Sequence, residues 1–351
     1  MQICMTQLQL PPEWHAQSGV ILAWPHRHSD WVANLAGIDP VYTAIAHAIT
    51  ERQPLIVLHY DAAHRHHIEA LLAHHGTPAN RVHFFEVPTN DTWVRDTAPL
   101  TVLDSAGACV LLDFQFNGWG GKYDATLDNS INARLTALGA FRAVELRMVD
   151  LVLEGGSIEV DGQGTLLTTA ACLLAKTRNP GLSKRELELR LGEQLGVQRF
   201  LWLENGYLAG DDTDSHVDML ARFCSPDTLA YVRCDDPQDE HYSALTRMED
   251  ELRAFRRADG QPYRLVPLPW PRARYDTEGG RLPASYANFL IINGAVLLPT
   301  YEDPGDAQAV AALQAVFPGR DIVPIPSLPL ITQRGSVHCA TMQLPAGVLA
   351  L

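Results

Sequence analysis

The sequence predicts an α/β fold in which five ββαβ modules surround a pseudo-fivefold axis. The order strand, turn, strand, helix, strand recurs along the 351 residues at a spacing of about 60 residues. The turns between paired strands carry Asp, Gly, Asn or Pro, the residues that tight turns favour. Polar residues also fall at the same point of each module. The periodicity alone suits an ordinary mixed α/β sheet as well, so the polar residues decide in favour of the ring.

Four modules follow one another along the chain, each with two strands, one helix and a third strand. They are expected at 100–103, 109–116, 124–138 and 141–149; at 157–160, 165–174, 184–195 and 199–204; at 217–223, 228–234, 240–256 and 263–269; and at 288–292, 295–301, 306–317 and 321–326. The fifth is split, with its parts at 337–345, 19–25, 41–50 and 54–60. A helix at 62–75 and a strand at 82–88 are left over. Helices should cover the outside, and the leading strands should line a central channel.

Composition indicates one globular domain over residues 1–351, because no low-complexity linker divides the chain. The net charge of −14 argues against nucleic acid as a partner and favours cationic substrates. No apolar run approaches the roughly 20 residues needed to cross a bilayer, and the first residues do not resemble a signal peptide. The cysteines are scattered without a CxxC pair, which predicts reduced thiols in the cytoplasm. They are Cys4, Cys109, Cys172, Cys224, Cys234 and Cys339.

The start of each module carries a group that could take part in catalysis. In chain order these residues are Asp96, Glu154, His216 with Asp218, Asn288 and Cys339. In a ring of equivalent units such points converge on the axis, so one pocket would receive a thiol, an imidazole, an amide and three carboxylates. Each residue alone has an ordinary structural alternative: a buried apolar thiol, a core histidine, a local ion pair or a turn acceptor. The histidines of the 62–75 helix are expected on the surface and not at a metal.

These groups suit hydrolysis of a guanidinium, which is planar, cationic and rich in N–H donors. Two carboxylates can bind it bidentately, and a thiolate can attack its central carbon. A histidine can then protonate the departing ammonia and later activate water against the covalent amidino-cysteine. Nearby carboxylates would keep that imidazole charged. This chemistry needs no metal and no cofactor.

Seven ordered segments resemble the agmatine deiminases and bacterial peptidylarginine deiminases. NDTWVRDTAP is similar to their N/D-D-x-W-x-R-D-x-G-P segment, and FNGWGGKY to their F-N-x-W-G-G segment. Counterparts in the same order are LEGGSIEVDGQGTLLTT, RNP, GDDTDSHVDMLARF, PASYANFLIINGAVLLP and GSVHCATMQLP. PPEWHAQSGVILAWP looks like the opening segment of the family. The resemblance covers essentially the whole chain. Ala98, Ser215 and Ser336 stand where the family usually has glycine, which puts loop geometry and substrate choice in question.

The resemblance implies a five-bladed α/β-propeller of the guanidino-group-modifying type, the pentein fold, acting as a single catalytic domain. It implies that Cys339 is the nucleophile and His216 the acid and base. Asp96 and Asp218 would bind the guanidinium, and Glu154 would support both the guanidinium and the histidine. Substrate-binding candidates are Trp93, Trp119, Asp212, Asp214 and Asn288. A homo-oligomer is expected on analogy alone.

The expected reaction is hydrolysis of agmatine to N-carbamoylputrescine and ammonia, a step in putrescine and polyamine biosynthesis. An enzyme for free arginine would need arginine side chains to bind the α-carboxylate, and a secreted enzyme for peptidyl arginine would be expected to carry a signal peptide. Arg95 should point away from the axis because it neighbours Asp96, and Arg178 is the one arginine that could overturn this expectation. The alternative outside the enzymes is a non-catalytic relative that binds guanidines or polyamines. The presence of both Cys339 and His216 argues against this alternative.

Overall fold

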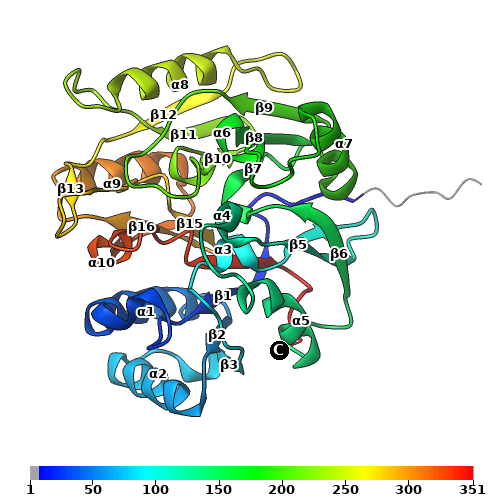
Figure 1. The fold of residues 1–351 in the computed structure, drawn as a ribbon, viewed down its shortest axis with the longest axis vertical. Coiled ribbons are helices and arrows are strands. Elements are labelled where there is room, and N and C mark those ends of the chain that lie inside the picture. The colour runs from blue at the N-terminus through cyan, green and yellow to red at the C-terminus, as the bar shows by residue number, and fades with distance from the viewer. Residues whose placement is uncertain (1–7, 351) are drawn as a thin grey trace, which may run out of the picture.

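The computed structural model, which describes residues 8–350, contains five main sheets arranged around a centre, with helices on their outer sides (Figure 1). Four of them are three-stranded modules along the chain. Their strands and main helices are β4 (Leu100–Leu103), β5 (Cys109–Gln115), α5 (Ile131–Ala137) and β6 (Glu145–Val152); β7 (Ile158–Val160), β8 (Thr165–Thr169), α7 (Lys184–Leu195) and β9 (Arg199–Leu203); β10 (Ala221–Ser225), β11 (Thr228–Val232), α8 (Tyr242–Ala254) and β12 (Arg264–Leu268); and β15 (Leu290–Ile292), β16 (Ala295–Thr300), α9 (Gly305–Val316) and β17 (Asp321–Pro326). The predicted ring of ββαβ modules is confirmed.

The fifth sheet joins the two ends of the chain in the order β18-β1-β2-β3. Its elements are β18 (Thr341–Pro345), β1 (Gln17–Ala23), α1 (Leu35–Thr50), β2 (Leu55–His59), α2 (Ala62–His75) and β3 (Val82–Glu86). As in every other module, the first strand pairs antiparallel with the second and the second pairs parallel with the third. Leu22 lies opposite Thr341 in this pairing. The helix and strand that the sequence left over are α2 and β3, which extend this sheet.

Short helical turns connect the modules and carry several site residues. They are η1 (Asp30–Asn34), η2 (Ala79–Arg81), α3 (Val94–Thr97), α4 (Gly118–Gly121), η3 (Asp128–Ser130), η4 (Gly155–Ser157), α6 (Ala170–Leu173), η5 (Val217–Met219) and α10 (Leu328–Ile331). The turns α3, η4 and η5 precede three different leading strands and pack against one another at the centre. The modules therefore bring their leading segments together there.

Strand alternation explains how one ring holds two hydrophobic cores. In β1, Val20 and Leu22 pack into one core, whereas Ile21 and Ala23 pack into the other. Successive side chains of a strand point to opposite faces, so a strand between two apolar layers must be apolar throughout. All five residues of β2 are buried for the same reason.

Helix α7 shows why the helix predictions were accurate where end signals are strong. Ser183 and Glu186 form a capping box at its start, and Gly196 ends it in the left-handed conformation. Leu187 and Leu191 are buried one turn apart on the same face. The predicted bounds, 184–195, agree with the structure.

Several predicted strand bounds were wrong. The strand expected at 165–174 ends at Thr169, because the Thr169 side chain accepts a hydrogen bond from the Cys172 backbone and caps the turn α6. The last strand begins at Thr341 and not at 337, and 217–219 forms the turn η5. Helix α1 begins at Leu35 instead of 41. The hairpin of β13 (Arg274–Tyr275) and β14 (Arg281–Leu282) was missed.

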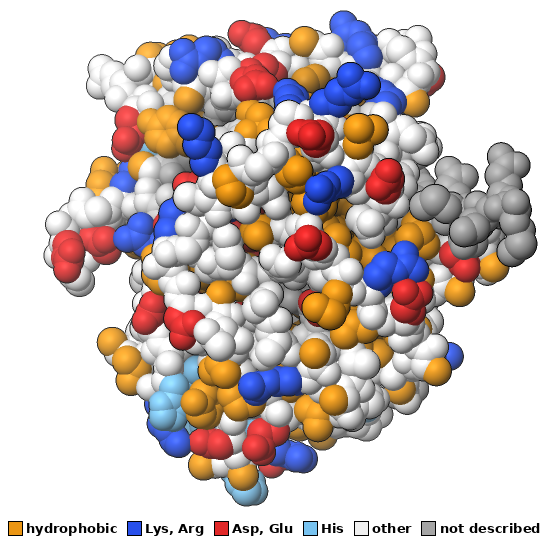
Figure 2. Space-filling view, turned by 45° about the vertical axis from the view of Figure 1, so that its right-hand side comes forward, with side chains coloured by type: hydrophobic (Ala, Val, Ile, Leu, Met, Phe, Trp, Pro, Cys, Tyr) orange, Lys and Arg blue, Asp and Glu red, His pale blue; other side chains and the backbone are white. Residues whose placement is uncertain are grey.

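The surface shows no segregation of charge on the face drawn in Figure 2, where acidic, basic and apolar side chains are interspersed. Within residues 8–350, none of the helices is long and apolar enough to cross a membrane. Cys109, Cys172, Cys224, Cys234 and Cys339 are free thiols, and Cys4 lies outside the described residues. In helix α2, His66 and His67 are exposed, as expected.

Candidate active site

A cleft at the centre of the ring contains most of the predicted site residues. Its walls include Trp93, Asp96, Trp119, Asp212, His216 and Cys339. These walls combine aromatic side chains with polar groups that converge on one space, as is usual in a small-molecule site. The segments before β4, β10 and β18 each supply at least one of these side chains. Three of the five predicted segments therefore converge on the cleft, whereas Glu154, Asp218 and Asn288 are not among the residues that line it.

Asp96 lies in the turn α3, and donors on two other segments fix its carboxylate. Trp119 donates from Nε1 to Oδ2 at 2.9 Å, and the Gly156 backbone donates to Oδ1 at 2.9 Å. Burial raises the pKa of Asp96, although the nearby His216 opposes that shift. Trp119 thus has a defined contact with Asp96 in addition to its place in the cleft wall. The side chain of Trp93 lies against Trp31, with ring centroids 5.9 Å apart.

His216 is the imidazole at the cleft, and acidic groups surround its buried ring. Its Nδ1 lies 3.7 Å from Asp96 Oδ1. Burial disfavours the charged ring, but Asp96, Cys172 and Glu154 outweigh it and raise the pKa of His216 well above its ordinary value. The protonated ring is therefore favoured, which suits an acid that gives a proton to a leaving group.

Cys339 follows the predicted Gly-Ser-x-His segment and lies at the bottom of the cleft. Its Sγ is 3.2 Å from Asn288 Nδ2 and 3.7 Å from Asp218 Oδ2. Asn288 Oδ1 accepts from the backbone N–H groups of His338 and Cys339, so this amide positions the thiol from beneath. Burial, with Asp218 and Asp96, raises the pKa of the Cys339 thiol. A bound cation between these carboxylates would lower that pKa again.

Asp218 and Asn288 are completely buried and lie behind the cleft wall. Asp218 Oδ2 is 2.7 Å from His338 Nδ1, whereas Asp218 Oδ1 has no hydrogen-bond partner. His338 Nε2 lies 2.7 Å from Glu13 Oε2. The sequence analysis missed this contact, although both His338 and Glu13 stand in segments that it compared. The His338 ring thus contacts Glu13 at one nitrogen and Asp218 at the other, and this pair of contacts holds Asp218 in a fixed orientation.

Glu154 and Asp214 lie away from the cleft and bind Arg178. Glu154 Oε1 accepts from Arg178 Nε at 3.0 Å, and both side chains are fully buried. Asp214 forms ion pairs with Arg178 and with Lys122 Nζ. Arg178 therefore supports Glu154 and does not line the cleft. Asp214 also pairs with Arg178, and it is not among the residues that line the cleft.

Gly156 lies where three site side chains meet. A Cβ atom there would lie 2.7 Å from His216 Nδ1, 2.9 Å from Asp96 Oδ1 and 3.0 Å from Asp218 Oδ2. Real Cβ atoms do not approach polar atoms so closely, so glycine is needed for the three groups to converge. The neighbouring Gly155 would similarly place a Cβ 2.2 Å from the Arg95 carbonyl oxygen.

Arg95 is buried beneath the cleft, where its Nε donates to the His338 carbonyl and its Nη2 lies 3.8 Å from Glu13. It does point away from the cleft, as the sequence predicted. The reason differs from the expected one, because Arg95 stands in the helical turn α3 and not in a strand.

The mouth of the cleft holds residues that the sequence analysis did not single out. They are Asp30, Asp91, Tyr123, Asp211, Gln333 and Arg334. Tyr123 donates to Asp212 Oδ2 at 2.7 Å, and Arg334 Nε lies 3.8 Å from the same oxygen. Burial raises the pKa of Asp91 to about 7. Carboxyl groups without a cationic partner are left in this wall, and Arg334 is the one arginine or lysine side chain that lines the described cleft.

Two groups of described side chains have the composition of a metal site. One comprises Glu154, Cys172 and His216, and the other comprises Glu13, Glu159 and His338. In the second group Arg222 pairs with both glutamates, and His338 lies 2.7 Å from a carboxylate oxygen at each ring nitrogen. The reacting groups around Cys339 can perform covalent catalysis on a planar cation by themselves, with a thiol, an acid and two carboxylates.

Comparison with known proteins gives matches along nearly the whole chain. The Porphyromonas-type peptidyl-arginine deiminase family matches residues 9–345. An agmatine deiminase of Pseudomonas fluorescens is 36% identical over 360 residues, covering 96% of this chain and 95% of that protein. The crystal structure of a candidate arginine deiminase from Porphyromonas gingivalis is 49% identical with a TM-score of 0.91, and covers 97% of this chain and 99% of that one. The C. jejuni agmatine deiminase, as a cysteine-to-serine variant with substrate bound, is 34% identical with a TM-score of 0.90 and 98% coverage of both chains.

Proposed function

Because this chain belongs to the Porphyromonas-type peptidyl-arginine deiminase family, we propose that it hydrolyses agmatine to N-carbamoylputrescine and ammonia. One observation carries the proposal: a thiol, a charged imidazole and a carboxylate share one acid-lined cleft. In this proposal Cys339 is the nucleophile and His216 the acid and base. Asp96 and Asp218 bind the guanidinium, and Glu154 supports His216.

Binding prepares the thiol for attack. The guanidinium donates to Asp96 in the cleft and reaches past the wall beside Cys339 to the unpartnered Oδ1 of Asp218, which brings its central carbon above Cys339. Its positive charge offsets the two carboxylates that raise the pKa of the thiol. Substrate binding and formation of the thiolate therefore favour each other.

Attack by Cys339 forms a C–S bond and a tetrahedral adduct. The bond from carbon to one terminal nitrogen then breaks, and His216 gives that nitrogen the proton with which it leaves as ammonia. The remaining amidino-cysteine is attacked by water, whose proton passes to His216. Cleavage of the C–S bond expels the Cys339 thiolate, and the C=O of N-carbamoylputrescine forms as the C–OH proton passes to the sulfur. This proton replaces the one that the thiol lost to solvent when the substrate bound.

The far end of agmatine carries an ammonium group, and the outer cleft wall suits a second cation. Asp30, Asp91, Asp211 and Asp212 lie there with the faces of Trp93 and Trp119 available for cation–π contact. Asn288 and Asp214, expected from the sequence to bind substrate, take other roles in this proposal. Asn288 positions the thiol, and Asp214 holds Arg178.

Arginine is the second candidate substrate, and Arg334 is the observation that favours it. Its side chain is 48% exposed at the cleft mouth, where a guanidinium could bind the carboxylate that agmatine lacks. The P. gingivalis protein described above, at 49% identity, points in the same direction. The four acidic residues beside Arg334 favour agmatine, because their charge repels a carboxylate.

Ammonia release from the two substrates tests this choice. We expect kcat/KM for agmatine to exceed that for arginine by at least about a hundredfold, because a buried carboxylate without a partner is costly. We also expect little ammonia release from a peptidyl arginine. Arg334→Gln should leave agmatine turnover unchanged or improved. Arg334→Lys, which retains the charge, serves as the matched control.

Comparable kcat/KM values for agmatine and arginine would refute the substrate assignment. So would an Arg334→Gln variant that loses arginine turnover through a higher KM while Arg334→Lys retains it. Neither result would change the assignment of Cys339 as nucleophile.

Gly156→Ala is expected to lower kcat by about a hundredfold. The added Cβ must displace His216, Asp96 or Asp218, and a displacement near 1 Å at reacting groups has an effect of that size. Thermal unfolding and initial rates measured together separate this effect from misfolding. Gly181→Ala is the control, because nothing lies within 4 Å of a Cβ at that position. A Gly156→Ala variant with the parent kcat would contradict the placement of these three groups.

We also propose that residues 1–351 act as one catalytic domain, since segments from different modules build one site. The free thiols among the described cysteines support a cytoplasmic location. The homo-oligomer stays a prediction from the family, to be measured by light scattering.

A further inference from the structure

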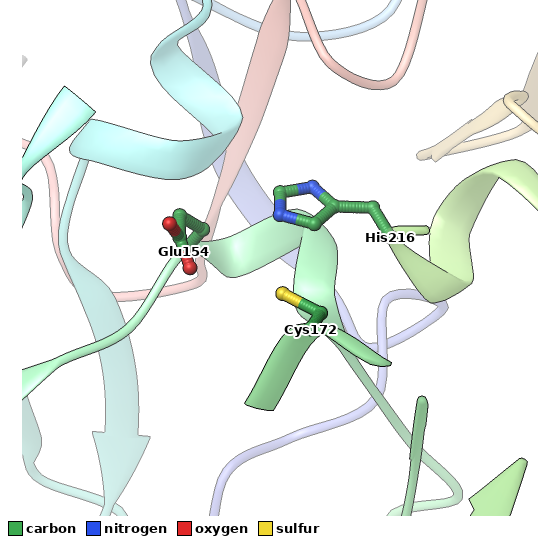
Figure 3. Close-up of side chains that lie close together, drawn as sticks. All are labelled: Glu154, Cys172 and His216. Carbon is green, nitrogen blue, oxygen red and sulfur yellow. The ribbon is translucent and has the colours of Figure 1, made fainter. Parts of the chain in front are cut away.

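Glu154, Cys172 and His216 form a buried group of metal-ligating side chains beneath the cleft (Figure 3). The reaction proposed above uses His216 and Glu154 but gives Cys172 no part. We propose that these three side chains bind Zn²⁺ and that the bound metal stops the enzyme. The inhibitory effect rests on the proposed function, whereas the metal site itself does not.

The geometry of the group is close to that of a zinc site. One ligand atom from each residue lies within 4.8 Å of the other two. In a tetrahedral zinc site the ligand atoms are roughly 3.5 Å apart. Side-chain movements that shift these atoms by about 1 Å would therefore bring them to zinc-binding distances. Figure 3 shows the three side chains beside one another, with the Cys172 sulfur below the imidazole. Thiolate, imidazole and carboxylate are all ligands that zinc accepts.

Several potential ligand atoms of this group have no partner in the protein. Glu154 gives Oε1 to Arg178, but its Oε2 has no hydrogen-bond partner. Both ring nitrogens of His216 are also without one, and His216 is only 1% exposed. Buried polar atoms are nearly always satisfied, so unpartnered atoms on adjacent side chains indicate a missing ligand.

Surrounding contacts hold two of the three ligands in place. Thr169 accepts from the Cys172 backbone and donates its hydroxyl to the Ser215 carbonyl, which ties the turn α6 to the segment that carries His216. Arg178 fixes the Glu154 carboxylate. Such outer contacts are typical of sites that orient metal ligands. His216 lines the cleft, so a metal ion can enter through it.

The charges of the group balance those of a divalent metal. A Cys172 thiolate, a Glu154 carboxylate and a neutral His216 carry two negative charges, which Zn²⁺ cancels. Arg178 pairs with both Glu154 and Asp214, and Asp214 also pairs with Lys122, so one positive charge is left beside the ligands. The Asp96 carboxylate, 3.7 Å from His216 Nδ1, offsets that charge. The other group of metal-ligating side chains, Glu13, Glu159 and His338, is less suited to a metal. Its two glutamates pair with Arg222, and its histidine pairs with Asp218. The site beneath the cleft is therefore the one that a metal can occupy.

Zinc bound there would remove the acid and base of the reaction. A coordinated ring nitrogen holds no proton, so His216 could not protonate the departing ammonia. The substrate could still reach Asp96 and Cys339. Inhibition should thus lower kcat more than it raises KM.

Cobalt(II), which takes zinc sites and gives a thiolate charge-transfer absorption, tests the site without measuring activity. The chelator-treated enzyme and its Cys339→Ser variant should both show this absorption with one Co²⁺ bound. Cys172→Ser should lack it. Absorption that disappears in Cys339→Ser but persists in Cys172→Ser would overturn the proposal, because the nucleophile would then be the ligand. Absence of the absorption in every form would overturn it too.

Zinc inhibition of ammonia release tests the consequence. Zn²⁺ should inhibit the parent enzyme reversibly, with activity restored by EDTA, and Cys172→Ser should raise the half-inhibitory Zn²⁺ concentration at least about tenfold. Cys172 does not line the cleft but helps to raise the pKa of His216, so zinc inhibition of each variant is measured relative to its own metal-free turnover. Cys224→Ser, another buried thiol, is the matched control and should keep full sensitivity. Equal sensitivity of Cys172→Ser and the parent would refute the inference. If the chain released no ammonia from any guanidine, the cobalt measurement would still decide whether the metal site exists.

Discussion

Cys339→Ser is expected to lower ammonia release from agmatine by at least about four orders of magnitude. A serine hydroxyl is barely ionised at neutral pH and is a far weaker nucleophile than a thiolate at the guanidinium carbon. Residues that form a covalent bond with substrate show losses of this order or more when removed. The measurement is the initial rate of ammonia release with saturating agmatine.

The same variant should still bind agmatine. Asp96 and Asp218 do not depend on the sulfur, and serine is similar in size to cysteine. Agmatine should therefore raise the melting temperature of Cys339→Ser as it does that of the parent. Cys224→Ser, a buried thiol outside the cleft, should retain full turnover. Undiminished activity of Cys339→Ser, or a covalent adduct mapped to another cysteine, would end the proposed mechanism.

His216→Gln is expected to lower kcat by about a thousandfold while KM changes little. Glutamine retains hydrogen bonding but cannot carry a proton to the leaving nitrogen or take one from water. The guanidinium is held by Asp96 on another segment and by Asp218, whose carboxylate His338 keeps in place, so substrate binding should persist. Steady-state kinetics with agmatine, together with mass spectrometry of Cys339 during turnover, follow both half-reactions.

His66→Gln is the control for this change, since that histidine is exposed on helix α2. It should behave as the parent enzyme. A His216→Gln variant with near-normal kcat would mean that another group, or solvent, transfers the proton.

The ring and its central residues could be predicted from the sequence because both follow from repetition. Polar residues recurred before each leading strand, and a closed ring leaves only one place where such points meet. Asp96, His216 and Cys339 line one cleft for that reason. Their roles remain predictions, and the variants above test them.

Other parts of the site could not be read from the pattern. Cys172 stands in a stretch that reads as an apolar strand, and only the cap at Thr169 turns it toward His216. Arg334 has a positive φ of 67° at the end of a loop, so no periodicity indicates where its side chain points. Glu13 reaches His338 from the other end of the chain. These placements depend on tertiary packing between segments that are distant in sequence.

The split sheet has a consequence for how the chain folds. Strand β18 follows the nucleophile and pairs with β1, so that Leu22 meets Thr341 across nearly the whole sequence. Closing a loop of that length carries an entropic cost on the order of 5 kcal/mol, and contacts so distant form slowly. Until they form, β1 has an unpaired edge that can associate with other chains. The Cys339 thiol is thus positioned in the late, aggregation-sensitive stage of folding, and regain of activity should report the slowest refolding phase.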